Sequence, residues 1–152
     1  MGVDERLKEL GIELPPVARP VASYIPVAVG GGLAFVAGQV PLEDGKPLAV
    51  GRVGEGISVE EGAALARRCA LQALAALKEE LGSLDLVRRI VKVTVWVASA
   101  EGFTQQPQVA NGASDLLGDV FGEAGRHARA AVSAPSLPLG VPVEVELIAE
   151  IT

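Results

Sequence analysis

The fold is decided by the C-terminal stretch, residues 127–152, which reads HARAAVSAPSLPLGVPVEVELIAEIT. Apolar and charged residues alternate from Val143 to Leu147, which is the period of a β-strand with one buried face. The two valines and the leucine of this run are predicted to face the core. Glu144 is then predicted to face the opposite side of the sheet.

The beginning of the same stretch is interpreted in the same way. Arg129 starts a strand-like run in which Ala130 and Val132 are predicted to point inward, with Arg129 on the opposite face. Two adjacent strands would then present Arg129 and Glu144 on one face. An arginine there can bind a carboxylate through two hydrogen bonds, and a glutamate can move protons or orient water. Two charges on a solvated sheet face is the alternative interpretation.

Outside this stretch, segments whose apolar residues have the spacing of a strand alternate with segments that have the spacing of a helix. Gly30–Gly32 joins two apolar runs and predicts a β-hairpin. The predicted segments are helices over 4–10, 58–81 and 107–123 and strands over 24–29, 33–39 and 91–97. This order predicts an α+β domain over 1–152, with one mixed sheet, two helices on one face, and an N-terminal extension (1–19) carrying a short helix.

The face of the sheet away from the helices is predicted to carry Trp96 and Ile148. One helix layer cannot cover both faces, so burial of this second face requires another subunit.

Composition excludes several classes of function. The chain has 13 Lys and Arg against 19 Asp and Glu, giving a net charge of −6, which argues against nucleic-acid binding. No apolar run approaches the roughly 20 residues of a membrane span, and the N-terminus does not resemble a signal peptide, so a cytoplasmic location is expected. Cys69 is the only cysteine and His127 the only histidine, so no structural metal is expected.

Several patches, taken in order, are similar to the RidA/YjgF reactive-intermediate deaminase family, also called L-PSP endoribonuclease-like. The patches are Tyr24, Val36–Pro41 (VAGQVP), Val91–Val97 (VKVTVWV), Ala128-Arg129, Leu137-Pro138 and Val143–Glu146 (VEVE). The resemblance implies a chorismate-mutase-like fold, a homotrimer, clefts between subunits and no cofactor.

The resemblance also implies roles for individual residues. Arg129 corresponds to an arginine that binds the substrate carboxylate, and Glu144 to a glutamate that orients water. Tyr24 lines the same cleft, and Asn111 is the nearest match to the cleft asparagine. The activity implied is that of a 2-iminobutanoate/2-iminopropanoate deaminase, which hydrolyses an enamine or imine to a keto acid and ammonia.

The chain departs from the family pattern at two cleft positions. Ala37 replaces a serine before the Gly-Gln of the hairpin, and Ala131 replaces a cysteine two residues after Arg129. Glu146 and Glu150 share a face with Glu144 and are alternatives to it for this role. His127 is either catalytic or a residue that closes a loop.

Two functions are therefore considered. One is a cofactor-free hydrolase of small enamine or imine carboxylates. The other is a trimeric binding module that holds a small carboxylate metabolite without converting it. Ribonuclease activity is less compatible with this sequence, because the chain has one histidine and a net negative charge.

Overall fold

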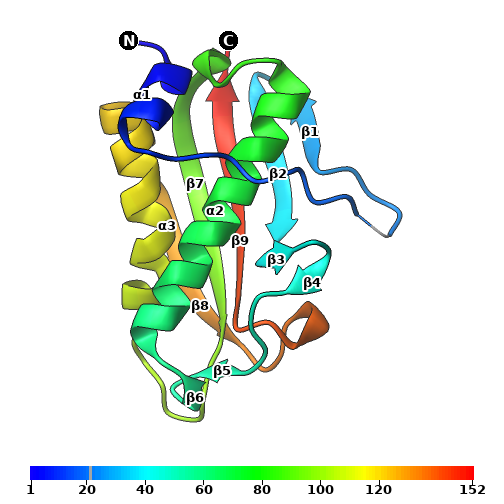
Figure 1. Cartoon of the computed structure of the whole chain (residues 1–152), viewed down its shortest axis with the longest axis vertical. Coiled ribbons are helices and arrows are strands. Elements are labelled where there is room, and N and C mark those ends of the chain that lie inside the picture. Colours follow the sequence, from blue (N-terminus) through cyan, green and yellow to red (C-terminus); the bar gives the residue numbers. More distant parts are fainter. Residues whose placement is uncertain (21) are drawn as a thin grey trace.

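The computed structural model describes residues 1–20 and 22–152 and shows α-helices packed on a mixed sheet (Figure 1). The helices are α1 (Val3–Glu9), α2 (Val59–Leu81) and α3 (Gln106–Phe121). The long strands are β2 (Leu33–Gln39), β7 (Val87–Ala98), β8 (Ala128–Ala134) and β9 (Val143–Ile151). The short strands are β1 (Val27–Gly30), β3 (Leu42–Glu43), β4 (Lys46–Pro47), β5 (Arg52–Val53) and β6 (Gly56–Ile57). Short 3₁₀ turns span Leu84–Leu86, Gly122–Gly125 and Pro138–Gly140.

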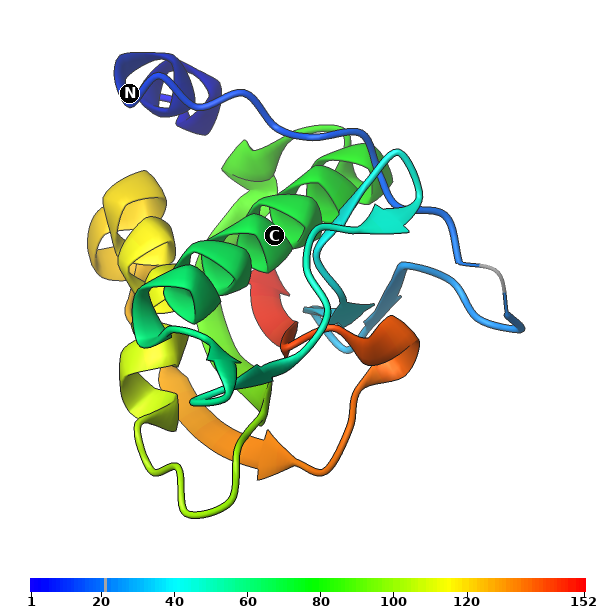
Figure 2. The ribbon, with the colours of Figure 1, turned by 60° about the horizontal axis from the view of Figure 1, so that its bottom comes forward.

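The main sheet has five strands in the order β1-β2-β9-β7-β8. Strand β8 runs parallel to β7, and the other pairs are antiparallel. Helices α2 and α3 lie side by side on one face of this sheet (Figures 1 and 2). The predicted fold class, an α+β domain with a mixed sheet and both helices on one face, is confirmed.

Helix α2 begins and ends where its sequence predicts. The Ser58 hydroxyl accepts a hydrogen bond from the Glu61 backbone N–H at 3.0 Å, and Gly82 ends the helix at a φ of 85°. Helix α3 packs closely against α2 at Gly112, where an added Cβ would overlap the backbone of Ala63 in α2. No helix within residues 1–20 and 22–152 is long and apolar enough to cross a membrane.

The alternating patterns of β7 and β9 build the core as predicted. Val93 pairs with Leu147, and Val95 pairs with Val145, and all four side chains are buried beneath the helices. Among the residues that the structure describes, no helix lies on the opposite face of the sheet (Figure 2). Phe35 on this face is 44% exposed.

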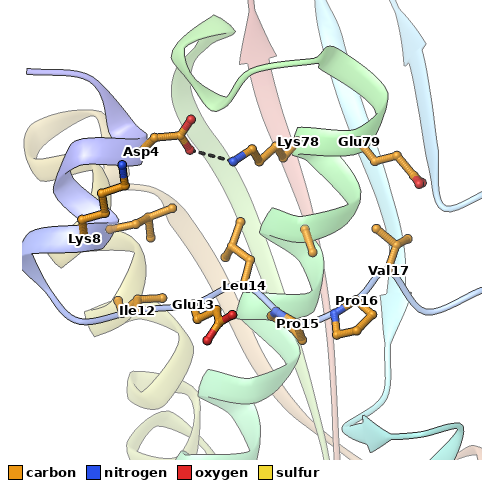
Figure 3. Close-up of a pocket in the computed structure, with 12 residues that line it drawn as sticks. Asp4, Lys8, Ile12, Glu13, Leu14, Pro15, Pro16, Val17, Lys78 and Glu79 are labelled. Atoms are coloured by element: carbon orange, nitrogen blue, oxygen red, sulfur yellow. Dashed lines mark hydrogen bonds and ion pairs between the residues drawn. The ribbon is translucent and has the colours of Figure 1, made fainter.

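The N-terminal segment is fastened to the helix layer and crosses α2 (Figure 1). The Val3 backbone N–H donates to Asp85 Oδ1 at 2.7 Å, and Lys78 Nζ lies 2.9 Å from Asp4 Oδ1. An open groove lies beneath this segment, with apolar side chains and a mixture of acids and bases along it (Figure 3). These contacts hold α1 against the domain.

Candidate functional site

Glu144 lies where the pairing of β2 with β9 is interrupted. The register moves from Val36 opposite Leu147 to Gln39 opposite Val145, so the β2 strand bulges between these pairs. Gly38 lies in the bulge, and a Cβ at this position would overlap Glu144 Oε2. The missing side chain of Gly38 therefore makes room for the Glu144 carboxylate.

A pocket of about 930 Å³ opens at this bulge. Its lining includes Glu144, Tyr24, Gly38, Gln39, Arg68 and Gln72. The N-terminal segment from residue 13 to residue 20 and the β3–β4 hairpin form other parts of its wall. This volume is within the range of small-molecule sites. The structure therefore places Tyr24 and Glu144, two of the predicted site residues, at one pocket.

The Glu144 carboxyl is half-buried, and burial raises its pKa above the ordinary value. The neighbouring charge of Glu146 raises this pKa further. No hydrogen bond to the Glu144 carboxylate is present among the described residues. A carboxylate with a raised pKa is a better proton acceptor near neutral pH than an exposed one.

The predicted orientation of β8 is wrong. Arg129 pairs with the buried Val93, so its side chain is on the helix-covered face rather than on the open face. Val132, which was predicted to point inward, is 37% exposed. The strand is at the edge of the sheet, where small residues such as Ala130 and Ala131 give little indication of which face is buried.

Arg129 is held by helix α3. Its Nη1 donates to Asn111 Oδ1 at 2.8 Å and to Ser114 Oγ at 3.1 Å. Ser114 Oγ also lies 2.9 Å from His127 Nε2, and His127 Nδ1 lies 2.7 Å from the Gly125 carbonyl. Because that carbonyl only accepts, His127 Nδ1 carries a proton, and Ser114 Oγ contacts the other ring nitrogen, Nε2. His127 thus orients the serine that contacts Arg129.

Asn111 was predicted from the sequence as a site residue, whereas Ser114 was not. The two residues are three positions apart and therefore share one face of α3, which was the available signal. What the sequence could not reveal was the face of β8 that Arg129 occupies.

Arg129 and Glu144 are not brought together within one chain. The predicted adjacency of their strands is wrong, because β7 lies between β8 and β9. Glu144 pairs with Trp96, on the face opposite to that of Arg129. The chain therefore carries two separate groups, one containing Glu144 and Tyr24 and the other containing Arg129 and Asn111.

Glu146 and Cys69 have other surroundings. Glu146 Oε1 accepts a hydrogen bond from Trp96 Nε1 at 2.9 Å, on the open sheet face. Cys69 is fully buried in α2, and burial raises the pKa of its thiol, with a further contribution from Glu144. A thiol in this state is a poor nucleophile. Within the described part of the chain, no group of three or more His, Cys, Asp or Glu side chains is placed to hold a metal ion.

The mixed sheet, its two-helix layer and the bulge beside Glu144 define a chorismate mutase-like domain. The family model described as "YjgF/chorismate_mutase-like, putative endoribonuclease" matches residues 4–151. The chain belongs to this family, the YjgF/RidA family. The match includes most of the N-terminal helix.

Similar proteins cover nearly the whole chain. Protein TCP17 of Trypanosoma cruzi is 45% identical over 150 residues, covering 98% of this chain and 94% of that protein. The crystal structure of Atu1372 from Agrobacterium tumefaciens, a protein of unknown function, is 44% identical, with a TM-score of 0.91 over 99% of this chain and 92% of that one. A "putative endoribonuclease" structure from Shewanella oneidensis is 36% identical, with a TM-score of 0.95 over 99% of this chain and 100% of that one.

Proposed function

We propose that this protein hydrolyses small enamine or imine carboxylates to a keto acid and ammonia. The observation that carries the proposal is the half-buried Glu144 carboxylate, whose pKa is raised, in a ligand-sized pocket that Tyr24 also lines. Family membership supports the same chemistry.

The reaction needs one water and no redox step. Glu144 accepts a proton from this water as its oxygen attacks the imine carbon, and the C=N bond becomes a C–N single bond. The resulting carbinolamine collapses to the C=O of the keto acid as the C–N bond breaks. Glu144 returns the first proton to the nitrogen as the carbinolamine forms, and it passes the hydroxyl proton to the nitrogen as the C–N bond breaks, so that the nitrogen leaves as ammonia. A single carboxylate can move the protons in both stages.

The proposed site is completed by a second subunit of a homotrimer. The open sheet face carries apolar side chains, including Phe35 and Val132, that a partner can bury. Arg129 and Glu144 are on opposite faces within one chain. In the proposed trimer, Arg129 of one subunit therefore binds the substrate carboxylate beside Glu144 of the next. Sedimentation equilibrium should give the mass of a trimer, and a monomer at micromolar concentration would contradict this part of the proposal.

Ammonia release tests the activity directly. An L-amino-acid oxidase generates 2-iminobutyrate from 2-aminobutyrate in the cuvette, and the protein should accelerate ammonia release above the spontaneous rate. The matched control is Glu144→Gln, which keeps the size of the side chain and removes the basic oxygen. Equal rates for the wild type and Glu144→Gln would contradict the proposed hydrolysis.

Mixing two inactive variants tests the shared site. Glu144→Gln and Arg129→Ala are unfolded together and refolded in equal amounts. If each site takes Glu144 from one subunit and Arg129 from its neighbour, about a quarter of the sites regain both residues. No recovery from well-folded mixed trimers would mean that the two residues do not share a site.

The alternative function is a trimeric binding module for a small carboxylate metabolite. Ala37 and Ala131 favour it, because each replaces a polar residue of the family pattern with a methyl group. This alternative predicts keto-acid binding without ammonia release above the spontaneous rate.

RNA cleavage is a weaker candidate despite the names of some relatives. The chain has a net charge of −6, and the only histidine uses both ring nitrogens in contacts with Ser114 and Gly125. These features provide neither a phosphate-binding field nor a free acid–base pair.

A further inference from the structure

Arg68 brings a positive charge to the wall of the Glu144 pocket. It projects from α2, is partly buried, and lines this pocket. Its Nη2 donates to the Leu42 carbonyl at 2.8 Å, and its Nε donates to Gln72 Oε1 at 3.2 Å. These two contacts fix the plane of the guanidinium group. Its third nitrogen, Nη1, has no hydrogen-bond partner among the described residues.

Gln72 makes this arrangement rigid. It is 2% exposed, and its Nε2 donates to the Val40 carbonyl at 2.8 Å and to Gln39 Oε1 at 3.4 Å. Its Oε1 also accepts from the Leu42 backbone N–H at 3.0 Å. Arg68 is therefore held before any ligand arrives, which lowers the entropy lost on binding.

The charge of Arg68 has no acidic partner within 4.0 Å in the described part of the chain. Arg19, the other cation that lines the pocket, differs because Glu79 binds it through two hydrogen bonds. Glu144 is not the counter-ion of Arg68 either, since the raised pKa of Glu144 has burial and Glu146 as its causes. Partly buried charges are usually paired. A guanidinium group left in this state is suited to an anionic group of a ligand.

We propose that Arg68 binds a second carboxylate of the substrate, so that the pocket selects imino dicarboxylates over imino monocarboxylates. The inference rests on the proposed function, in which Arg129 of the neighbouring subunit binds the carboxylate next to the imine carbon. Arg68 then receives the carboxylate at the far end of the substrate. Glu144 acts on the imine carbon between them.

Binding of the keto-acid products tests this selectivity without requiring turnover. Calorimetry compares 2-oxoglutarate with 2-oxobutyrate on the assembled wild type, on Arg68→Gln and on Arg67→Gln. Arg67 is the exposed neighbour on the same helix and controls for the loss of one positive charge. We expect the wild type and Arg67→Gln to bind 2-oxoglutarate at least tenfold more tightly than 2-oxobutyrate. In Arg68→Gln this preference should disappear, with little change in 2-oxobutyrate affinity.

Equal wild-type affinity for the two keto acids would overturn the inference, and so would a preference that survives in Arg68→Gln. If Arg68→Gln does not fold, a wild-type crystal structure with 2-oxoglutarate decides, because the far carboxylate should contact Arg68 Nη1. Ammonia release from the two corresponding imines separates the two proposals. Arg68-dependent binding without ammonia release refutes the hydrolysis and keeps the dicarboxylate site. Ammonia release without a preference for dicarboxylates refutes the dicarboxylate site and supports the hydrolysis.

Discussion

The two groups of candidate residues differ in how the chain holds them. Glu144 lies on a central strand at a bulge, half-buried and without a hydrogen-bond partner in the described residues. Arg129 lies on the edge strand and is held by Asn111 and Ser114 of α3. The first group is therefore suited to proton transfer, because its charge is poorly stabilised. The second is suited to binding, because its orientation is fixed in advance.

The difference also explains why one chain cannot supply both residues to the proposed shared site. Strand β7 separates the two strands, and the pairings of Val93 with Arg129 and of Trp96 with Glu144 put the two charges on opposite faces. Rotation of side chains does not carry them across a packed core. Only a second subunit can bring an Arg129 to a Glu144, so assembly and activity are expected to depend on each other.

Removing the Glu144 base should have the largest effect. Glu144→Gln is expected to lower kcat by roughly 10²–10⁴-fold with little change in KM, because a general base acts mainly in the transition state. Steady-state ammonia release measures both constants. Glu146→Gln is the matched control, since Glu146 contacts Trp96 on the open face. A greater loss of kcat in Glu146→Gln than in Glu144→Gln would assign the role of base to Glu146.

Removing the Arg129 guanidinium should instead weaken binding. Arg129→Ala is expected to cost on the order of 2–5 kcal/mol in keto-acid affinity, as for the loss of one partner of a desolvated charge pair. Arg129→Lys should recover little, because an ammonium group cannot form two parallel hydrogen bonds. Calorimetry gives the affinity, and size-exclusion chromatography checks assembly. Unchanged affinity in a folded Arg129→Ala variant that assembles like the wild type would show that Arg129 is structural.

The sequence predicted the elements whose patterns repeat over many residues. The alternating valines of β7 and the residues that flank α2, Ser58 and Gly82, are local signals of burial and backbone geometry. The strand predicted over 91–97 and the helix predicted over 58–81 were both confirmed. The prediction of which side chains of β8 face the core was wrong for a physical reason. Its alanines are compatible with either face, so hydrophobic alternation could not fix the direction of Arg129.

The residues that line the candidate pocket could not be predicted in the same way, because they are brought together by contacts between segments distant in the sequence. Arg68 and Gln72 are polar residues of α2, and they bind the backbone around Val40 and Leu42. Such pairings leave no periodic signal in a single sequence. The Gly38 bulge was also hidden, because a glycine within a strand run has several possible causes.

Filling the bulge should have a smaller effect than removing the base. In Gly38→Ala the new methyl group overlaps the Glu144 carboxylate and must displace it. A misplacement of about 1 Å is expected to lower kcat/KM on the order of 10²-fold. The control is Gly30→Ala in β1, where an added Cβ meets no atom within 4 Å. Equal kinetics for Gly38→Ala and the wild type would show that the position of the carboxylate does not matter.

The smallest expected effect is a pH-dependent change in stability. Burial in the folded chain raises the pKa of Glu144 above its ordinary value of 4.5. At pH values between 4.5 and this raised pKa, the folded state therefore binds more protons than the unfolded state. Stability is therefore lost as pH rises through this window and stays lower above it. Glu144→Gln removes this penalty and should raise Tm at pH 7.5, with a smaller gain at pH 4. Differential scanning calorimetry at both pH values measures the change, with Glu101→Gln, an exposed loop residue, as the control for charge removal. A gain that is the same at both pH values, or a lower Tm at pH 7.5, would mean that burial of Glu144 does not destabilise the folded chain.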